Sequence, residues 1–156
     1  MVGFPIYGLI TNVYGPQKAG DKRSFLKYLI NLRDLNPSVH WVLGGDFNLI
    51  TSLEEKKGGC RCLEEECNLF KETIGDLGLL YITLGEEWFT SNNKRTWDHH
   101  IASIFDQFLV SKSIIDLGSE IHCATLSGRG SDHWPIKLMW SGLGSQFKKY
   151  FCFGEF

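Results

Sequence analysis

Three consecutive polar residues, Ser131, Asp132 and His133, stand directly before an apolar run that ends at Trp140. The run has the composition of a buried strand, so the three side chains would lie where that strand begins. A carboxylate beside an imidazole at a strand end could bind a divalent cation and transfer a proton. A polar loop that enters a buried strand would look similar, so the tripeptide alone does not establish a site.

A second polar group follows another predicted strand, over residues 39–43, where two glycines lead into Asp46. The glycines let the backbone turn tightly, and Asp46 and Asn48 would then project to one side with Phe47 in the core. An acid and an amide on one rim suit a metal-activated water and a hydrogen-bond partner for that water. The alternative is a turn rich in Asp and Asn that only ends the strand.

Asp106 lies within an otherwise apolar predicted strand, residues 103–110. A buried carboxylate is costly without a partner. His133 is the natural partner, because an Asp behind a His fixes the tautomer and stabilises the imidazolium. A purely structural ion pair is the rival interpretation. Tyr14, at the end of the first predicted strand, could donate a hydrogen bond to a phosphate oxygen or could simply belong to a turn.

Apolar periodicity predicts the elements that would bring these residues together. Continuous apolar runs predict buried strands, and apolar residues at helical spacing predict helices. The predicted strands cover residues 6–13, 39–43, 88–90, 103–110, 120–126 and 134–140, and the helices lie between Asp21 and Asn36 and over residues 63–77. Asp21 is expected to cap the first helix. This mixture predicts an α/β sandwich with polar groups clustered at strand ends.

Length and composition predict one ordinary globular domain. The chain has 156 residues, of which 43% are hydrophobic and 22% charged. We expect the domain to span residues 1–141, followed by a C-terminal tail, residues 142–156, which shows no pattern and need not be ordered. The net charge of −2 lacks the basic excess typical of phosphate-dependent nucleic-acid binding, without excluding a nucleic-acid substrate. Oligomeric state cannot be read from the sequence.

The same features indicate where the chain would work. No apolar stretch is long enough to span a bilayer, so no membrane partner is expected, and residues 1–7 lack the layout of a signal peptide. Five cysteines, an odd number, argue against a disulfide framework and for a reducing, intracellular compartment.

Taken together and in order, the polar clusters resemble the endonuclease/exonuclease/phosphatase superfamily, which has the DNase I-like fold. The closer resemblance is to the apurinic-type endonuclease domain of plant LINE-type (non-LTR) retrotransposons, and it covers roughly Ile6 to Trp140. It rests on the segments NVYGP (12–16), GDFN (45–48), EEKKGG (54–59), FT (89–90) with NN (92–93), AS (102–103) with DQFLVS (106–111), and SDHWPI (131–136).

This resemblance implies Mg²⁺-dependent hydrolysis of a phosphodiester, with Mn²⁺ as an alternative cation. It implies DNA as the substrate, which is nicked to prime reverse transcription, and a nuclear setting. The implied fold is a four-layer α/β sandwich of the DNase I-like type, which would be incomplete because its N-terminal strands are missing from this chain.

Five residues take catalytic roles by resemblance. Tyr14 contacts the scissile phosphate. Asp46 lies at the metal and water site, and Asn48 hydrogen-bonds the attacking water or the phosphate. Asp106 orients His133, which acts as a base or as a transition-state stabiliser.

Three further residues take supporting roles. Asp132 serves the metal site together with Asp46. Thr90 falls where a threonine buttresses the active site, and Thr90 and Ser131 belong with Tyr14 and Asn48 to the positions expected to lie against the substrate.

The chain also departs from the family pattern. An Asn and the principal metal-binding Glu of the family come from strands upstream of the Tyr14 motif, and we expect both to be absent here. Ile104 and Phe105 replace an Arg and a smaller aliphatic residue. These departures suit a truncated copy, so we expect impaired DNA nicking. Two alternatives stay open: a catalytically inactive retrotransposon-derived remnant that at most binds nucleic acid or a partner, and a hydrolase of a small phosphate ester such as an inositol phosphate.

Overall fold

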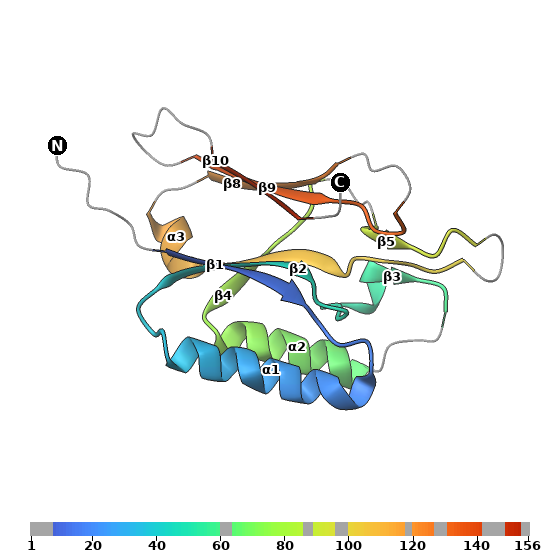
Figure 1. Ribbon diagram of the computed structural model, residues 1–156, viewed down its shortest axis with the longest axis horizontal. Helices are drawn as coiled ribbons and strands as arrows, with labels where there is room; N and C mark the ends of the chain where they lie inside the picture. The colour runs from blue at the N-terminus through green and yellow to red at the C-terminus, as the bar shows by residue number, and fades with distance from the viewer. Residues whose placement is uncertain are drawn as a thin grey trace.

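The computed structural model of the chain describes residues 8–59, 64–85, 89–95, 100–117, 120–126, 131–141 and 149–153, the last segment as backbone only. These residues form one larger sheet, two smaller sheets and a pair of long helices (Figure 1). The predicted α/β class is confirmed.

The central sheet has the order β1-β2-β7-β4. Its strands are β1 (Gly8–Tyr14), β2 (His40–Asp46), β7 (Asp106–Ser111) and β4 (Leu79–Ile82). β1 and β2 run parallel, whereas β7 is antiparallel to both β2 and β4. The carboxyl ends of β1 and β2 therefore meet the amino end of β7 at one edge of the sheet.

The other described strands form two smaller sheets. The outer sheet has the order β10-β9-β8, formed by β10 (Lys149–Phe153), β9 (Ile136–Ser141) and β8 (Glu120–Thr125). The small sheet has the order β3-β6-β5, formed by β3 (Lys56–Lys57), β6 (Ala102–Ser103) and β5 (Ser91–Asn92). Within the predicted tail, β10 pairs along β9, and the rest of residues 142–156 lies outside the described residues.

Helices α1 (Ala19–Asp34) and α2 (Glu64–Asp76) lie side by side on one side of the central sheet, opposite the outer sheet (Figure 1). Short helical turns occur at Leu53–Glu55 and at α3 (Lys112–Asp116). The described residues thus supply three layers of the expected four: helices, central sheet and outer sheet. No helix among them is long and apolar enough to cross a membrane.

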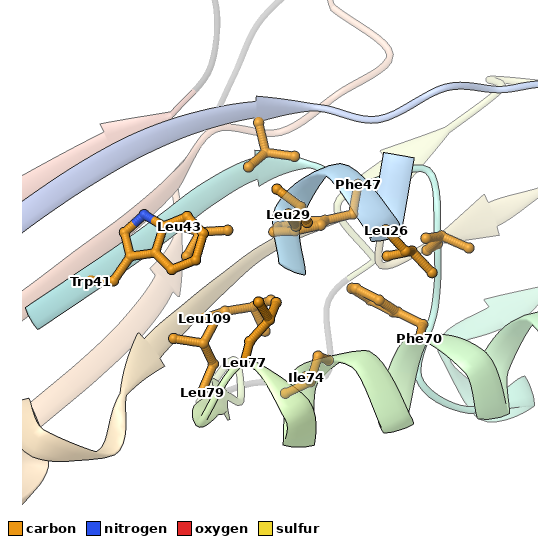
Figure 2. Packing of buried hydrophobic residues seen from close by; sticks show 12 residues of the cluster. Leu26, Leu29, Trp41, Leu43, Phe47, Phe70, Ile74, Leu77, Leu79 and Leu109 are labelled. Carbon is orange, nitrogen blue, oxygen red and sulfur yellow. The ribbon is translucent and has the colours of Figure 1, made fainter. Parts of the chain in front are cut away.

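One hydrophobic core lies between the helices and the central sheet (Figure 2). Phe47, which follows β2, is fully buried in this core, and its ring packs against Phe70 of α2 with 5.5 Å between centroids. The residue between Asp46 and Asn48 therefore anchors both polar neighbours to the helix layer, as the alternation of the sequence predicts.

A second hydrophobic core lies between the central and outer sheets. Its buried members are Val42, Phe108, Val110, Cys123, Ile136 and Leu138. Because β9 follows the segment Ser131–His133, this core fixes the distance between that segment and the central sheet.

Three predictions differ in detail. The strand predicted over residues 88–90 is absent at residues 89 and 90, which β5 follows, and residue 88 lies outside the described residues. The strand predicted over residues 103–110 is split between β6 and β7, because the Ile104 N–H donates to the Glu55 carbonyl and the Phe105 carbonyl accepts from Phe47. The predicted cap at Asp21 is wrong: Lys18 occupies the N-cap of α1, and Asp21 lies in the first turn. An acidic residue there still favours the helix dipole.

An apolar cavity of about 270 Å³ lies between β1, α3 and the outer sheet. Gly8 and His40, the first residues of β1 and β2, line it, so it lies at the other end of these strands from Tyr14 and Asp46. Its described lining holds no carboxylate, and we place no chemistry there.

Candidate active site

The polar residues predicted from the sequence meet at the carboxyl ends of β1 and β2. In the strand register, Asp46 pairs with Tyr14 on one side and with Asp106 on the other. Strand pairing alone therefore brings three of the candidate residues, from distant parts of the sequence, into one row across the sheet edge.

Glycines make this close approach of strand ends possible. Gly45 has φ +136°, and a Cβ there would collide with the Val13 carbonyl. A Cβ on Gly15 would collide with the Phe47 backbone. The Gly15 N–H instead donates to the Asp46 carbonyl at 2.6 Å, which ties the turn after β1 to the end of β2.

Asn48 holds the carboxylate of Asp46 in place. Its backbone N–H donates to Asp46 Oδ1 at 2.8 Å, and its side-chain Nδ2 donates to Asp46 Oδ2 at 3.2 Å and to the Gly15 carbonyl at 2.8 Å. Asn48 has φ +50°, a conformation that Asn tolerates better than most residues. Both amide hydrogens are used, so only Oδ1 of Asn48 is left to face water or substrate, and it can only accept.

The imidazole of His133 lies between two carboxylates. His133 Nδ1 is 2.8 Å from Asp106 Oδ2, and His133 Nε2 is 4.0 Å from Asp46 Oδ2. The pairing of Asp106 with His133 that the sequence predicts is thus present in the structure. A gap of 4.0 Å is too long for a direct hydrogen bond, but one water can bond to both atoms.

Burial and charge shift two pKa values at this site. The hydrogen bond to Asp106 is the largest cause that raises the pKa of His133; burial opposes it, and the charges of Asp106, Asp46 and Asp132 add to it. Burial is also the largest cause that raises the pKa of Asp46, against the opposing hydrogen bond from Asn48. The site thus places three carboxylates, those of Asp46, Asp106 and Asp132, around one imidazole.

Thr90 connects two of the segments that form the site. Its hydroxyl accepts the Asp106 backbone N–H at 3.0 Å, and its carbonyl accepts the Trp134 N–H at 2.7 Å. One residue thus links the start of β7 to the segment that carries His133. Thr90 is fully buried, so its hydroxyl is placed to support Asp106 rather than to touch a substrate.

The remaining candidates lie toward solvent. Tyr14 is 76% exposed at the end of β1. Ser131 is exposed, and its Oγ accepts the His133 N–H at 3.1 Å, so it shapes the turn and keeps its own hydroxyl hydrogen. Asp132 is exposed too, and its charge reaches His133, where it contributes to the raised pKa.

The donor set fits a Mg²⁺ ion only as a weak site. Among the described residues, no three His, Cys, Asp or Glu side chains gather as metal ligands. Mg²⁺ is, however, commonly held by one or two carboxylates, with waters and substrate phosphates as the other ligands. The charged form of Asp46 is disfavoured by burial and by the charge of Asp106, so a nearby cation would stabilise it.

Two supporting features were missed by the sequence analysis. Gln107, buried behind Asp106, donates from its side chain to the Leu49 and Ile104 carbonyls. Glu55 accepts from Thr51 and from Tyr81, whose pKa is raised by burial and by Glu55. A polar residue within an apolar strand, as at position 107, is the signal that could have drawn attention to the first.

Comparison with known proteins adds to this geometry. No family model and no curated protein matches the chain. Among solved structures, the endonuclease domain of TRAS1, a telomere-specific non-LTR retrotransposon, superposes with a TM-score of 0.62 over 86% of this chain at 18% sequence identity. The chain shares the fold of that domain. The predicted DNase I-like α/β sandwich is therefore confirmed, and the chain spans 56% of the length of the TRAS1 structure.

Proposed function

We propose that this chain is a metal-dependent phosphodiesterase of the endonuclease type, which nicks DNA at an impaired rate with Mg²⁺ and accepts Mn²⁺ in its place. The observation that carries the proposal is the imidazole of His133, bonded through Nδ1 to Asp106 and facing Asp46 through Nε2. The endonuclease fold and the motifs resembling those of plant LINE-type elements support DNA as the substrate.

The chemistry follows from the tautomer of His133. When Nδ1–H donates to Asp106, the neutral ring leaves Nε2 as an acceptor. A water between Nε2 and Asp46 Oδ2 gives its proton to Nε2 while its oxygen attacks phosphorus. The new P–O bond replaces the bond to one sugar oxygen, which leaves as an alkoxide and takes a proton from solvent water, and the other strand end keeps the phosphate.

The other candidates assist this step. The exposed hydroxyls of Tyr14 and Ser131 donate to phosphate oxygens, and Asn48 keeps Asp46 aimed at the water. Asp46, with Asp132 at the rim, would hold the cation. A bound Mg²⁺ supplies neutralisation of charge on the phosphate and on the leaving oxygen.

The proposal is tested by incubating purified chain with supercoiled plasmid and Mg²⁺ or Mn²⁺. We expect conversion to the nicked circle, and His133→Ala should slow it by at least about 100-fold, the size typical of losing a general base. His122→Ala, which changes an exposed histidine on the outer sheet, is the matched control and should nick normally. Absence of nicking by wild-type chain at high concentration would refute the proposal.

A second candidate function is a catalytically inactive remnant that binds nucleic acid or a partner without cleaving it. The absence of a three-ligand cluster among the described residues favours it. Titration calorimetry separates the two: the remnant takes up no Mg²⁺ or Mn²⁺ at a defined site, whereas the endonuclease binds one ion, more tightly when uncleaved DNA is present. Hydrolysis of an inositol phosphate in place of DNA would instead indicate the small-ester phosphatase.

A further inference from the structure

Gln107 lies directly behind the site, on the other face of the central sheet. Side chains alternate along β7, so Asp106 and Phe108 face the outer sheet, whereas Gln107 and Leu109 face the helices. The two hydrophobic cores agree with this, since Phe108 belongs to the core under the outer sheet and Leu109 to the core under the helices. Gln107 is only 2% exposed.

The amide of Gln107 joins two separate segments. Its Nε2 donates to the Leu49 carbonyl at 3.0 Å and to the Ile104 carbonyl at 2.8 Å. Leu49 directly follows Asn48, and Ile104 lies two residues before Asp106. The two hydrogen bonds therefore fix the spacing between the segment that carries Asp46 and Asn48 and the segment that carries Asp106.

The carbonyl oxygen of the same amide is in a different situation from its NH₂ group. Gln107 Oε1 is buried and finds no hydrogen-bond partner among the described residues. A buried acceptor without a partner lowers stability. Because the buried carbonyl oxygen lowers stability, the amide is of use here only through its two N–H donors. Both donors bond to backbone carbonyls beside site residues.

We propose that Gln107 is a positioning residue, which clamps the two segments so that His133 fits between Asp46 and Asp106. Gln107 is buried on the face of the central sheet opposite Asp106, so it acts through the residues that it holds. Its role in catalysis rests on the proposed function, whereas its role in the geometry does not.

The experiment replaces Gln107 by Met, which keeps the length of the side chain and removes both donors. We expect Q107M to fold, judged by circular dichroism, and to nick at least about 10-fold more slowly through kcat with KM changed by less than about 2-fold, since misplaced groups cost rate rather than binding. In the NMR spectrum, the low-field resonance of the His133 Nδ1 proton should move upfield or broaden by exchange. Thr73→Val, a buried polar-to-apolar change on α2, is the matched control and should alter neither.

Two results would each overturn the inference about Gln107. In wild-type chain, the Gln107 side-chain NH₂ protons should show cross-peaks to Leu49 and Ile104, and their absence would overturn the inference even if Q107M fails to fold. Unchanged kcat and an unchanged His133 resonance in folded Q107M would overturn it as well. If wild-type chain does not nick, the proposed function fails, and the NMR measurements alone decide whether Gln107 positions the site.

Discussion

At the scale of single residues, the site consists of three carboxylates around one imidazole. Asp106 bonds to His133, Asp46 faces its other nitrogen, and Asp132 adds charge from the rim. The imidazole can accept a proton here at little cost, because the carboxylates stabilise the cation that forms. The raised pKa of His133 is thus a direct consequence of its hydrogen bond to the partly buried carboxylate of Asp106.

Replacing Asp106 by Asn should lower the pKa of His133, because the hydrogen bond to Asp106 is the largest cause of its raised value. A histidine with a raised folded-state pKa stabilises the fold fully below its ordinary pKa of 6.5, and this contribution is lost as the pH rises through the raised value. Wild-type chain should therefore lose stability as the pH rises above 6.5, and D106N should lose less. NMR titration of His133 and urea unfolding at each pH measure the two effects.

Asp46 contributes with the same sign. Its pKa is raised from 3.8, so the stability it contributes is present below that value and is lost as the pH rises through the raised pKa. The NMR titration of His133 follows the imidazole alone and so separates the two groups. The matched control is Asp116→Asn, which makes the same change at an exposed position of α3. An identical His133 titration in wild-type and D106N chain would show that Asp106 does not control the imidazole.

At the scale of elements, the site depends on how closely β1 and β2 approach at their carboxyl ends. The sequence could predict the strands and the polar residues after them, because apolar runs ended by glycine and polar residues leave few alternatives. It could not predict that the chain changes sheets at Ile104 and Phe105. That break follows from hydrogen bonds to Glu55 and Phe47, which no local pattern encodes.

Gly45→Ala should destabilise the chain by at least about 2 kcal/mol, because Ala at φ +136° is strained and its Cβ collides with the Val13 carbonyl. Gly75→Ala is the matched control on α2, where a Cβ meets nothing within 4 Å. That change should stabilise the chain by up to about 1 kcal/mol, because Ala favours the helix. Urea unfolding measures both. Equal stability of G45A and wild-type chain would show that the strand ends do not need this close approach.

At the scale of the whole molecule, the site spans two layers. Asp46 and Asp106 belong to the central sheet, whereas His133 precedes β9 of the outer sheet. The sequence could predict the partners, because a buried acid needs a base. It could not predict the roles of Thr90 and Gln107, because these depend on which backbone groups lie beside them after the layers have packed.

Leu138→Ala should therefore damage the site more than Leu26→Ala, although the two changes are matched in type and burial. Leu138 lies in the core between the two sheets, and Leu26 in the core under the helices. Each truncation should cost about 2–5 kcal/mol. Only L138A loosens the layer that carries His133, and small displacements of positioned groups lower the rate of a reaction. At equal folded fraction, the nicking rate of L138A should therefore fall at least about 5-fold below that of L26A. The His133 Nδ1 proton resonance of L138A should also be weakened. Equal losses in both variants would mean that inter-sheet packing does not set the distance between the imidazole and the carboxylates.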